Sequence, residues 1–351
     1  MIKNVLVTGN HGYIGTIMTH ELIKGGFEVT GVDCDYFDYE KPFGRRDAFE
    51  SKNKVKKQIK KDIRDLTKKD FEGIDAVIHL AALPNDWACN LSPSATQDIN
   101  YLSTLQLATN AKRAGVERFV YASSCSVYGV KGNEEINEGD RPAPITPYGF
   151  SKLNSEEALK NFNTNDFSVV SMRNATCYGV SPRMRFDMVL NNLVGWVHTT
   201  GIVNMHESNG KTWRPIVHIE DVAQAYILAL KAPKDLISSN VFSVVGENYM
   251  VTDIAEIAKE SVPGSTIIYA ENAPQDWRSY RVIGSKIEKM LGFSPKWNAK
   301  DGAKELHQAY ESYELTEDEF RQNRIFWAGK QFGYLINNNL VDKDLKLKSL
   351  D

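Results

Sequence analysis

The sequence has few cysteines, no long apolar run and little excess of charge of either sign. Its four cysteines lie far apart, with no Cys-x-x-Cys pair and no His/Cys cluster at ligand spacing, so neither a disulfide framework nor a metal site is predicted. No run of 18 apolar residues occurs, and we therefore expect no membrane span. A net charge of −3 offers no basic surface for nucleic acid. The chain opens on an apolar strand pattern without a charged leader, which favours a soluble, cytoplasmic protein.

A glycine-rich turn follows the first apolar run. Residues 5–7 are apolar and predict a buried parallel strand, and Gly9, Gly12 and Gly15 come directly after it. In such a turn one glycine bends the chain, one lets the backbone approach a pyrophosphate, and one lets the following helix pack on the strand. Free N–H groups at the helix start favour phosphate binding. The pattern predicts a dinucleotide site.

Asp33 indicates which dinucleotide is bound. It ends a second apolar strand over residues 27–32, about 20 residues beyond the turn, as a strand–helix–strand unit requires. A carboxylate there accepts hydrogen bonds from ribose hydroxyls and repels a 2′-phosphate, so NAD is favoured over NADP. We interpret Arg45 and Arg46, farther along the chain, as solvated surface charges.

Two further strand ends carry candidate cofactor contacts. Asp62 and Ile63 follow a lysine-rich segment at residues 52–61, which we interpret as a solvated loop or edge strand. Asp62 is either an adenine ligand or a helix N-cap, and the sequence leaves both interpretations open. Residues 74–80 predict another buried strand, and the small side chains of Ala81 and Ala82 after it would leave room for the cofactor.

Hydroxyl groups gather where the next strand ends. The strand predicted over residues 116–122, after an amphipathic helix at 95–114, is followed by Ser123 and Ser124. These serines either satisfy backbone groups in a turn or face a ligand. Tyr148 and Lys152 come next, at a spacing that places them on one face of a helix predicted over 148–162. A neighbouring ammonium would lower the pKa of the phenol and make it usable as a base near neutral pH.

Taken in order, these motifs resemble the extended short-chain dehydrogenase/reductase family, in particular its nucleotide-sugar epimerase and dehydratase branch. The resemblance covers about residues 1–310. It implies that Tyr148 is the catalytic acid/base, that Lys152 holds the nicotinamide ribose, and that Ser124 contacts the reacting hydroxyl. The cofactor contacts that we predict on this basis are Gly9, Gly12, Tyr13, Ile14, Gly15, Asp33, Asp62, Ile63, Leu80, Ala81, Ala82, Asn100, Ser123, Tyr148 and Lys152.

The resemblance also implies a fold and a division of the chain. We expect an α/β protein with a doubly wound parallel sheet and a smaller C-terminal domain. Residues 1–176, with 216–246 returning to them, would form the NAD-binding Rossmann domain, and 177–215 and 247–315 the nucleotide-sugar domain. Residues 316–351 match nothing in the family pattern and are expected to form a helical tail. A homodimer through the helices at 95–114 and about 150–164 is expected.

Four residues are predicted to bind the nucleotide sugar: Arg183, Asn191, Arg214 and Arg278. The resemblance assigns Arg214 and Arg278 to the diphosphate. Arg183 and the nearby Arg185 either pair with a phosphate or sugar carboxylate, or form surface salt bridges.

Two departures from the family narrow the activity. The 4,6-dehydratases carry Asp-Glu where this chain has Cys125 and Ser126, which disfavours a 4,6-dehydratase. Cys125 is either a buried thiol or an additional acid/base group. The loop at residues 83–87 is also unusual and makes the sugar uncertain. We therefore expect an NAD-dependent nucleotide-sugar 4-epimerase without a metal. The alternatives are a C4 dehydrogenase, keto-sugar reductase or dehydratase, and a non-catalytic NAD-binding regulator.

Overall fold

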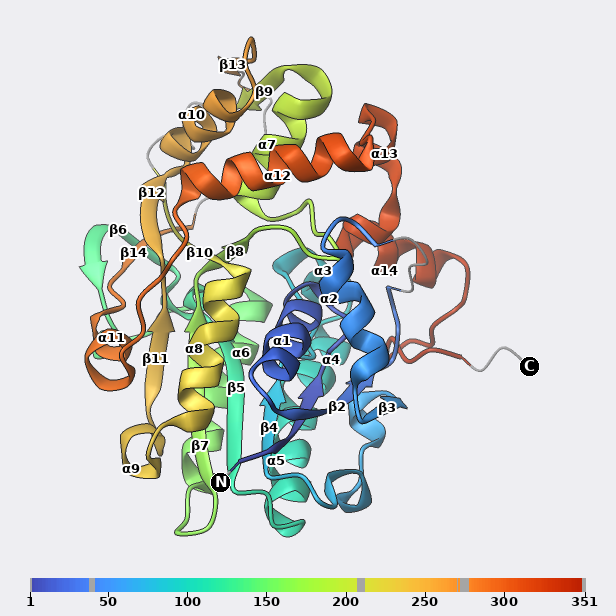
Figure 1. Cartoon of the computed structure of the whole chain (residues 1–351), viewed down its shortest axis with the longest axis vertical. Coiled ribbons are helices and arrows are strands. Elements are labelled where there is room, and N and C mark those ends of the chain that lie inside the picture. The colour runs from blue at the N-terminus through green and yellow to red at the C-terminus, as the bar shows by residue number, and fades with distance from the viewer. Residues whose placement is uncertain (1, 38–41, 207–211, 270, 272–277, 349–351) are drawn as a thin grey trace.

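A seven-stranded parallel sheet forms the centre of the computed structural model, which describes residues 2–37, 42–206, 212–269, 271 and 278–348 (Figure 1). Its strand order is β11-β7-β5-β4-β1-β2-β3. The bounds are β1 (Asn4–Thr8), β2 (Glu28–Asp33), β3 (Lys57–Lys60), β4 (Ala76–His79), β5 (Arg118–Ser124), β7 (Ser168–Asn174) and β11 (Val241–Val244). This is the doubly wound arrangement that the sequence predicts.

Helices cover both faces of this sheet (Figure 1). One face carries α1 (Tyr13–Lys24), α2 (Arg46–Ser51) and α8 (Ile219–Lys231), and the other α3 (Asp86–Leu91), α4 (Pro93–Thr96), α5 (Ser103–Arg113) and α6 (Pro147–Leu159). In β1, Val5 and Val7 join the hydrophobic cluster on the α1 side, while Leu6 joins the cluster on the α5 side. Both faces are therefore buried, which explains the uninterrupted apolar run.

The structure refines two predictions, for the lysine-rich segment at 52–61 and for the helix expected over 95–114. The lysine-rich segment supplies β3, which lies at one edge of the sheet, where its charged side chains are solvated. The helix expected over 95–114 is interrupted by a π-helical stretch, Gln97–Leu102, between α4 and α5. The carbonyl of Asn100 in this stretch accepts hydrogen bonds from the hydroxyls of Thr104 and Ser155. Side-chain hydroxyls thus satisfy a carbonyl where the regular helix ladder is disturbed.

A second group of elements lies beyond the carboxyl ends of the main strands (Figure 1). It contains a sheet of β8 (Thr176–Tyr178), β10 (Trp213–His218) and β12 (Glu247–Met250), and the pairs β9 (Ile202–Met205) with β13 (Thr266–Tyr269) and β6 (Val130–Ile136) with β14 (Ser279–Val282). Its helices include α7 (Val189–Thr200), α10 (Val251–Ser261) and α12 (Ala299–Tyr313). Between β10 and β12 the chain returns to the main sheet as α8, α9 (Lys234–Ile237) and β11, and α11 (Ser285–Leu291) packs near β11.

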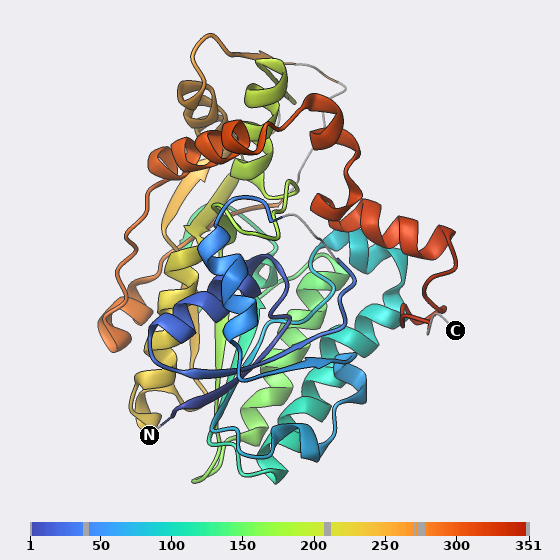
Figure 2. The same ribbon diagram turned by 45° about the vertical axis from the view of Figure 1, so that its right-hand side comes forward.

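The C-terminal segment forms α13 (Glu317–Gln322) and α14 (Ala328–Asn337) and then runs back along the first half of the chain (Figure 2). The ring of Phe332 lies 5.3 Å from that of Tyr36, and the Gln331 amide donates a hydrogen bond of 2.6 Å to the Tyr36 carbonyl. Arg64 donates to the carbonyl of Asp344 at 2.7 Å. The tail is therefore docked against the loop after β2 and the short helix after β3.

Candidate active site

A pocket of about 1450 Å³ lies over the carboxyl ends of the central strands, where open α/β sheets bind ligands. Both the main sheet and the second group of elements contribute to its walls. The predicted residues that line it are Gly9, Gly12, Tyr13, Ile14, Gly15, Asp33, Asp62, Ile63, Leu80, Ala81, Ala82, Ser123, Ser124, Tyr148, Lys152, Arg183, Arg214 and Arg278. Among the predicted residues, only Asn100 and Asn191 do not line this pocket.

The glycine turn has the shape that a pyrophosphate site needs. Gly9 has φ +74°, and a Cβ there would lie 3.0 Å from the backbone nitrogen of Ala81. A Cβ on Gly15 would lie 1.9 Å from the Gly9 carbonyl oxygen. These close approaches exclude side chains and bring the start of α1 next to the pocket, so that its free N–H groups can bind phosphate. The turn fits a dinucleotide.

Asp33 is held in place by backbone groups. Its Oδ2 accepts a hydrogen bond of 3.1 Å from the His11 N–H, and its Oδ1 one of 2.9 Å from the Asp35 N–H. Burial raises the pKa of Asp33, and these hydrogen bonds and the nearby His11 oppose that rise. Each carboxylate oxygen keeps acceptor capacity for the hydroxyls of a ribose.

Asp62 acts as a helix cap in the structure. It accepts hydrogen bonds from the Arg64 N–H at 2.9 Å and from the Arg64 guanidinium at 3.0 and 2.7 Å. The N-cap interpretation is therefore confirmed, and an additional contact with adenine stays a prediction. Arg45 pairs with Glu220 and Asp47, and Arg46 with Glu50, away from the pocket lining.

Tyr148, Lys152 and Ser124 meet at the end of β5. Thr146 caps α6 by accepting a hydrogen bond from the Gly149 N–H, and the helix then places Tyr148 and Lys152 one turn apart. The Lys152 ammonium donates to the Ala122 carbonyl at 2.8 Å and lies 5.6 Å from the centre of the Tyr148 ring. The Ser124 and Ser126 hydroxyl oxygens are 2.9 Å apart.

The electrostatics of this group differ from the simple expectation of an acidic phenol. Burial raises the pKa of Tyr148, and the charge of Arg185 and a hydrogen bond from Ser124 oppose the rise only in part. Burial also lowers the pKa of Lys152 to about 8. Within the protein alone, the loss of water around the phenol outweighs its cationic neighbours. Positive charge added beside the phenol would lower the pKa of Tyr148.

Three predicted contacts, Asn100, Asn191 and Ser123, are held by buried hydrogen bonds within the protein. The Asn100 amide is fully buried and bonds to the N–H of Leu83 at 2.7 Å and the hydroxyl of Ser151 at 3.3 Å. The Asn191 amide donates to the Tyr13 hydroxyl and the Arg185 carbonyl, each at 2.9 Å. Ser123 donates to Glu156, whose carboxylate pairs with Arg173. Direct contacts of these residues with a ligand stay predictions.

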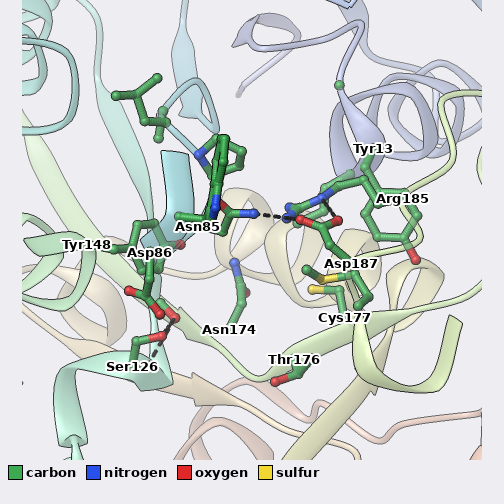
Figure 3. Close-up of a pocket in the computed structure, with 18 of the residues that line it drawn as sticks. Tyr13, Asn85, Asp86, Ser126, Tyr148, Asn174, Thr176, Cys177, Arg185 and Asp187 are labelled. Carbon is green, nitrogen blue, oxygen red and sulfur yellow. Dashed lines mark hydrogen bonds and ion pairs between the residues drawn. The ribbon is translucent and has the colours of Figure 1, made fainter. Parts of the chain in front are cut away.

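A chain of polar side chains forms the opposite side of the pocket (Figure 3). Arg185 binds Asp187 through two hydrogen bonds of 2.9 and 2.7 Å, and Asp187 accepts a third, of 2.6 Å, from Asn85. Of the two interpretations of the arginines, a surface salt bridge is thus wrong for Arg185, which pairs inside the pocket. The guanidinium of Arg183 lies 3.7 Å above the ring of Phe37.

The predicted diphosphate ligands lie close to one another. Arg214 of β10 is buried, and its guanidinium donates to the carbonyl of Arg278. The Arg278 guanidinium forms an ion pair of 2.8 Å with Asp86 of α3. Residues 274–277, part of the family's closing segment, lie outside the described residues.

Seven further residues line this pocket without having been predicted individually as site residues: Asn85, Asp86, Trp87, Asn174, Asp187, Trp196 and Trp327. The unusual loop at 83–87 was a signal for the first three. Asn174 lies beside Ser124 in the β5–β7 register and donates a hydrogen bond of 2.8 Å to the Tyr226 hydroxyl. Trp327 belongs to the C-terminal segment, for which no motif was available.

Cys125 is a buried thiol. It is 1% exposed, donates to the Arg173 carbonyl at 3.4 Å, and has its pKa raised by burial.

Among the residues that the structure describes, no group of three or more His, Cys, Asp and Glu has the arrangement of a metal site. No described helix is both long and apolar enough to span a membrane.

The chain is similar to known proteins over most of its length. Residues 5–245 match the model of the NAD dependent epimerase/dehydratase family. A UDP-glucose 4-epimerase of Bacillus subtilis (strain 168) is 26% identical over 332 residues, which cover 86% of this chain and 94% of that protein. A human dTDP-D-glucose 4,6-dehydratase is 27% identical over 323 residues, covering 88% of this chain and 90% of that protein.

Among solved structures, MoeE5 is similar to this chain. Its complex with UDP-glucuronic acid and NAD has a TM-score of 0.75 at 28% identity, covering 88% of this chain and 99% of MoeE5. The same protein has also been solved with UDP-glucose and NAD, with a TM-score of 0.73. The chain belongs to the NAD dependent epimerase/dehydratase family and is an NAD-dependent enzyme of nucleotide sugars.

Proposed function

We propose that this protein is a nucleotide-sugar 4-epimerase that works through a transient 4-keto sugar. The observation that carries the proposal is the meeting of Tyr148, Lys152 and Ser124 in one pocket with the glycine turn, while Cys125 and Ser126 supply no carboxyl group. Elimination of water needs an acid and a base beyond the tyrosine, which these two positions lack. Epimerisation at C4 needs only one acid/base group.

The chain's own residues divide the work. Tyr148 takes the proton of the C4 hydroxyl and later returns it, and Ser124 donates a hydrogen bond to the reacting oxygen. Lys152, held on the Ala122 carbonyl, binds the nicotinamide ribose and keeps a positive charge near the phenol. Bound NAD supplies a hydride acceptor and donor for C4. Lys152 favours the phenolate that burial alone disfavours, and the positive charge of a bound nicotinamide ring would add to this effect.

Residues 1–176 and 216–246 would bind the dinucleotide, and 177–215 with 247–315 the nucleotide sugar. Arg214 and Arg278 would hold the diphosphate, because Arg214 lies on β10, Arg278 directly precedes β14, and both line the pocket. Residues 316–351 would close the pocket on the side of Trp327.

The assay uses purified protein with UDP-glucose or dTDP-glucose and no added cofactor. Formation of the 4-epimer supports the proposal. Accumulation of a keto product together with reduced NAD would indicate a C4 dehydrogenase or, run in reverse, a keto-sugar reductase, and a 4-keto-6-deoxy product a dehydratase. Mass spectrometry of small molecules released on denaturation tests for carried NAD. Bound NAD without turnover of any nucleotide sugar would point to the non-catalytic regulator.

A homodimer in the cytoplasm is the assembly and location that we propose. Leu102 and Phe150 are apolar side chains on the two expected interface helices and are 48% and 50% exposed, as a covered surface would require. All four cysteines are free, which suits a reducing compartment. Light scattering of the purified protein tests the dimer, and Phe150→Glu should produce the monomer.

A further inference from the structure

Asp86 places a carboxylate in the part of the pocket where the sugar reacts. It begins α3 directly after the unusual loop, and Figure 3 shows it on the same side of the pocket as Tyr148 and Ser126. One oxygen, Oδ2, pairs with Arg278 at 2.8 Å. The other, Oδ1, is buried and has no hydrogen-bond partner in the described part of the chain. A buried acceptor without a partner in the protein can accept a hydrogen bond from a ligand in the pocket.

Binding of a diphosphate to Arg278, as proposed above, would change the pairing of charges in this pocket. Arg185 is already neutralised by Asp187, which Asn85 holds in place. Arg278 is paired with Asp86, so a diphosphate that binds Arg278 competes with this carboxylate. Once Arg278 faces phosphate, Asp86 has lost its partner next to the sugar. The sugar then meets an uncompensated negative charge.

From this arrangement, and on the basis of the proposed function, we infer that Asp86 makes the site selective for nucleotide sugars without a carboxylate. The hydroxyl groups of a neutral hexose can donate to Oδ1 of Asp86, which satisfies the buried acceptor. The carboxylate of a hexuronate can only accept, and it would stand opposite a like charge in a poorly solvated pocket. One protein of this fold, MoeE5, has been solved with UDP-glucuronic acid and with UDP-glucose, so the fold alone does not separate the two sugars, and we assign the discrimination in this chain to Asp86.

The experiment compares the wild type with Asp86→Asn, which keeps the size of the side chain and a hydrogen bond to Arg278. UDP-glucose and UDP-glucuronic acid are assayed as substrates, and calorimetry measures their binding, and that of UDP, to the NAD-loaded protein. Asp318→Asn removes the same charge from an exposed position on α13 and serves as the control. Thermal unfolding shows whether each variant is folded.

We expect the wild type to prefer UDP-glucose. Asp86→Asn should lower the ratio of kcat/KM for UDP-glucose to kcat/KM for UDP-glucuronic acid by about tenfold or more, because a like charge opposite the hexuronate is removed. UDP should bind several-fold more tightly to Asp86→Asn, because its diphosphate no longer competes with a charged carboxylate for Arg278. The control should change neither value.

Three results would overturn the inference: a wild type that prefers UDP-glucuronic acid, a ratio that Asp86→Asn leaves unchanged, or a variant that loses turnover of both sugars equally. The last result would make Asp86 an acid/base group. Failure of the proposed function gives a different outcome, since in that case neither UDP-sugar binds or reacts with the wild type.

Discussion

The two sides of the pocket hold their functional groups in different ways. On the dinucleotide side, the glycine turn and Asp33 are fixed by backbone contacts between neighbouring strands and the start of α1. On the sugar side, Arg185, Asp187 and the Asp86–Arg278 pair are charged side chains that bind one another across different elements. The first side is therefore formed by the protein backbone itself, whereas on the second side we propose that the ligand replaces an internal partner of Arg278.

Tyr148 stands where the two sides meet, and its removal should have the largest effect. Tyr148→Phe should lower kcat by about a thousandfold, since proton transfer by a positioned group contributes that order of rate. The dinucleotide side is untouched, so the NAD content after gel filtration should equal that of the wild type. Tyr334→Phe, at an exposed tyrosine of α14, is the control. Turnover that survives in Tyr148→Phe would rule out the assigned base.

The C-terminal tail supports the dinucleotide side from outside, through Phe332. This ring is 1% exposed and lies 5.3 Å and 5.6 Å from the rings of Tyr36 and Phe37, both of which line the pocket. Phe332→Ala should lower the free energy of unfolding by about 3 kcal/mol and weaken NAD binding. Urea denaturation and NAD titration measure both. Ile336→Ala, 40% exposed on the same helix, should change neither.

The difference between the two sides also explains what could be predicted from the sequence. The positions of the buried strands and of the turn follow from local patterns, because a buried parallel strand is apolar and a close approach to phosphate needs glycine. The unusual loop at 83–87 marks Asp86 as a pocket residue but not its partner Arg278, and Asn174 and Trp327 carry no local signal. Asp86, Asn174 and Trp327 reach the pocket only because α3 follows an irregular loop, β7 pairs with β5, and α14 folds back on α3.

A substitution in the glycine turn tests whether the backbone fixes the dinucleotide side of the pocket. Gly15→Ala would place a Cβ 1.9 Å from the Gly9 carbonyl oxygen, which only a shift of the backbone can relieve. We expect about 1–3 kcal/mol lower stability and at least a tenfold weaker affinity for NAD. Gly139→Ala, in an exposed turn, is the matched control. An unchanged NAD affinity would contradict a turn that binds the pyrophosphate.

The variant Asp187→Asn tests whether the sugar side binds its ligand independently of the dinucleotide side. Asp187→Asn keeps the shape of the side chain but leaves Arg185 without its negative partner, so the loop that carries both should loosen. We expect KM for the nucleotide sugar to rise several-fold while the dissociation constant of NAD stays the same. Asp65→Asn, at an exposed ion pair with Lys346, should alter neither constant. A loss of NAD binding in Asp187→Asn would show that the two sides are coupled.

Lys152 lies where the two sides of the pocket meet. As the pH rises, its titration should lower kcat but raise its contribution to the stability of the fold. Burial lowers the pKa of Lys152 to about 8, whereas an unfolded lysine titrates near 10.4. As the pH rises above about 8 the folded protein loses this ammonium, so kcat should fall. Between about pH 8 and 10 the unfolded chain binds the additional proton, and this residue's contribution to stability therefore rises with pH. Lys152→Met lacks the titrating group, so the stability of the wild type relative to this variant should increase from pH 8 to 10. If that difference fell together with kcat, the loss of activity would reflect unfolding and not the titration of Lys152.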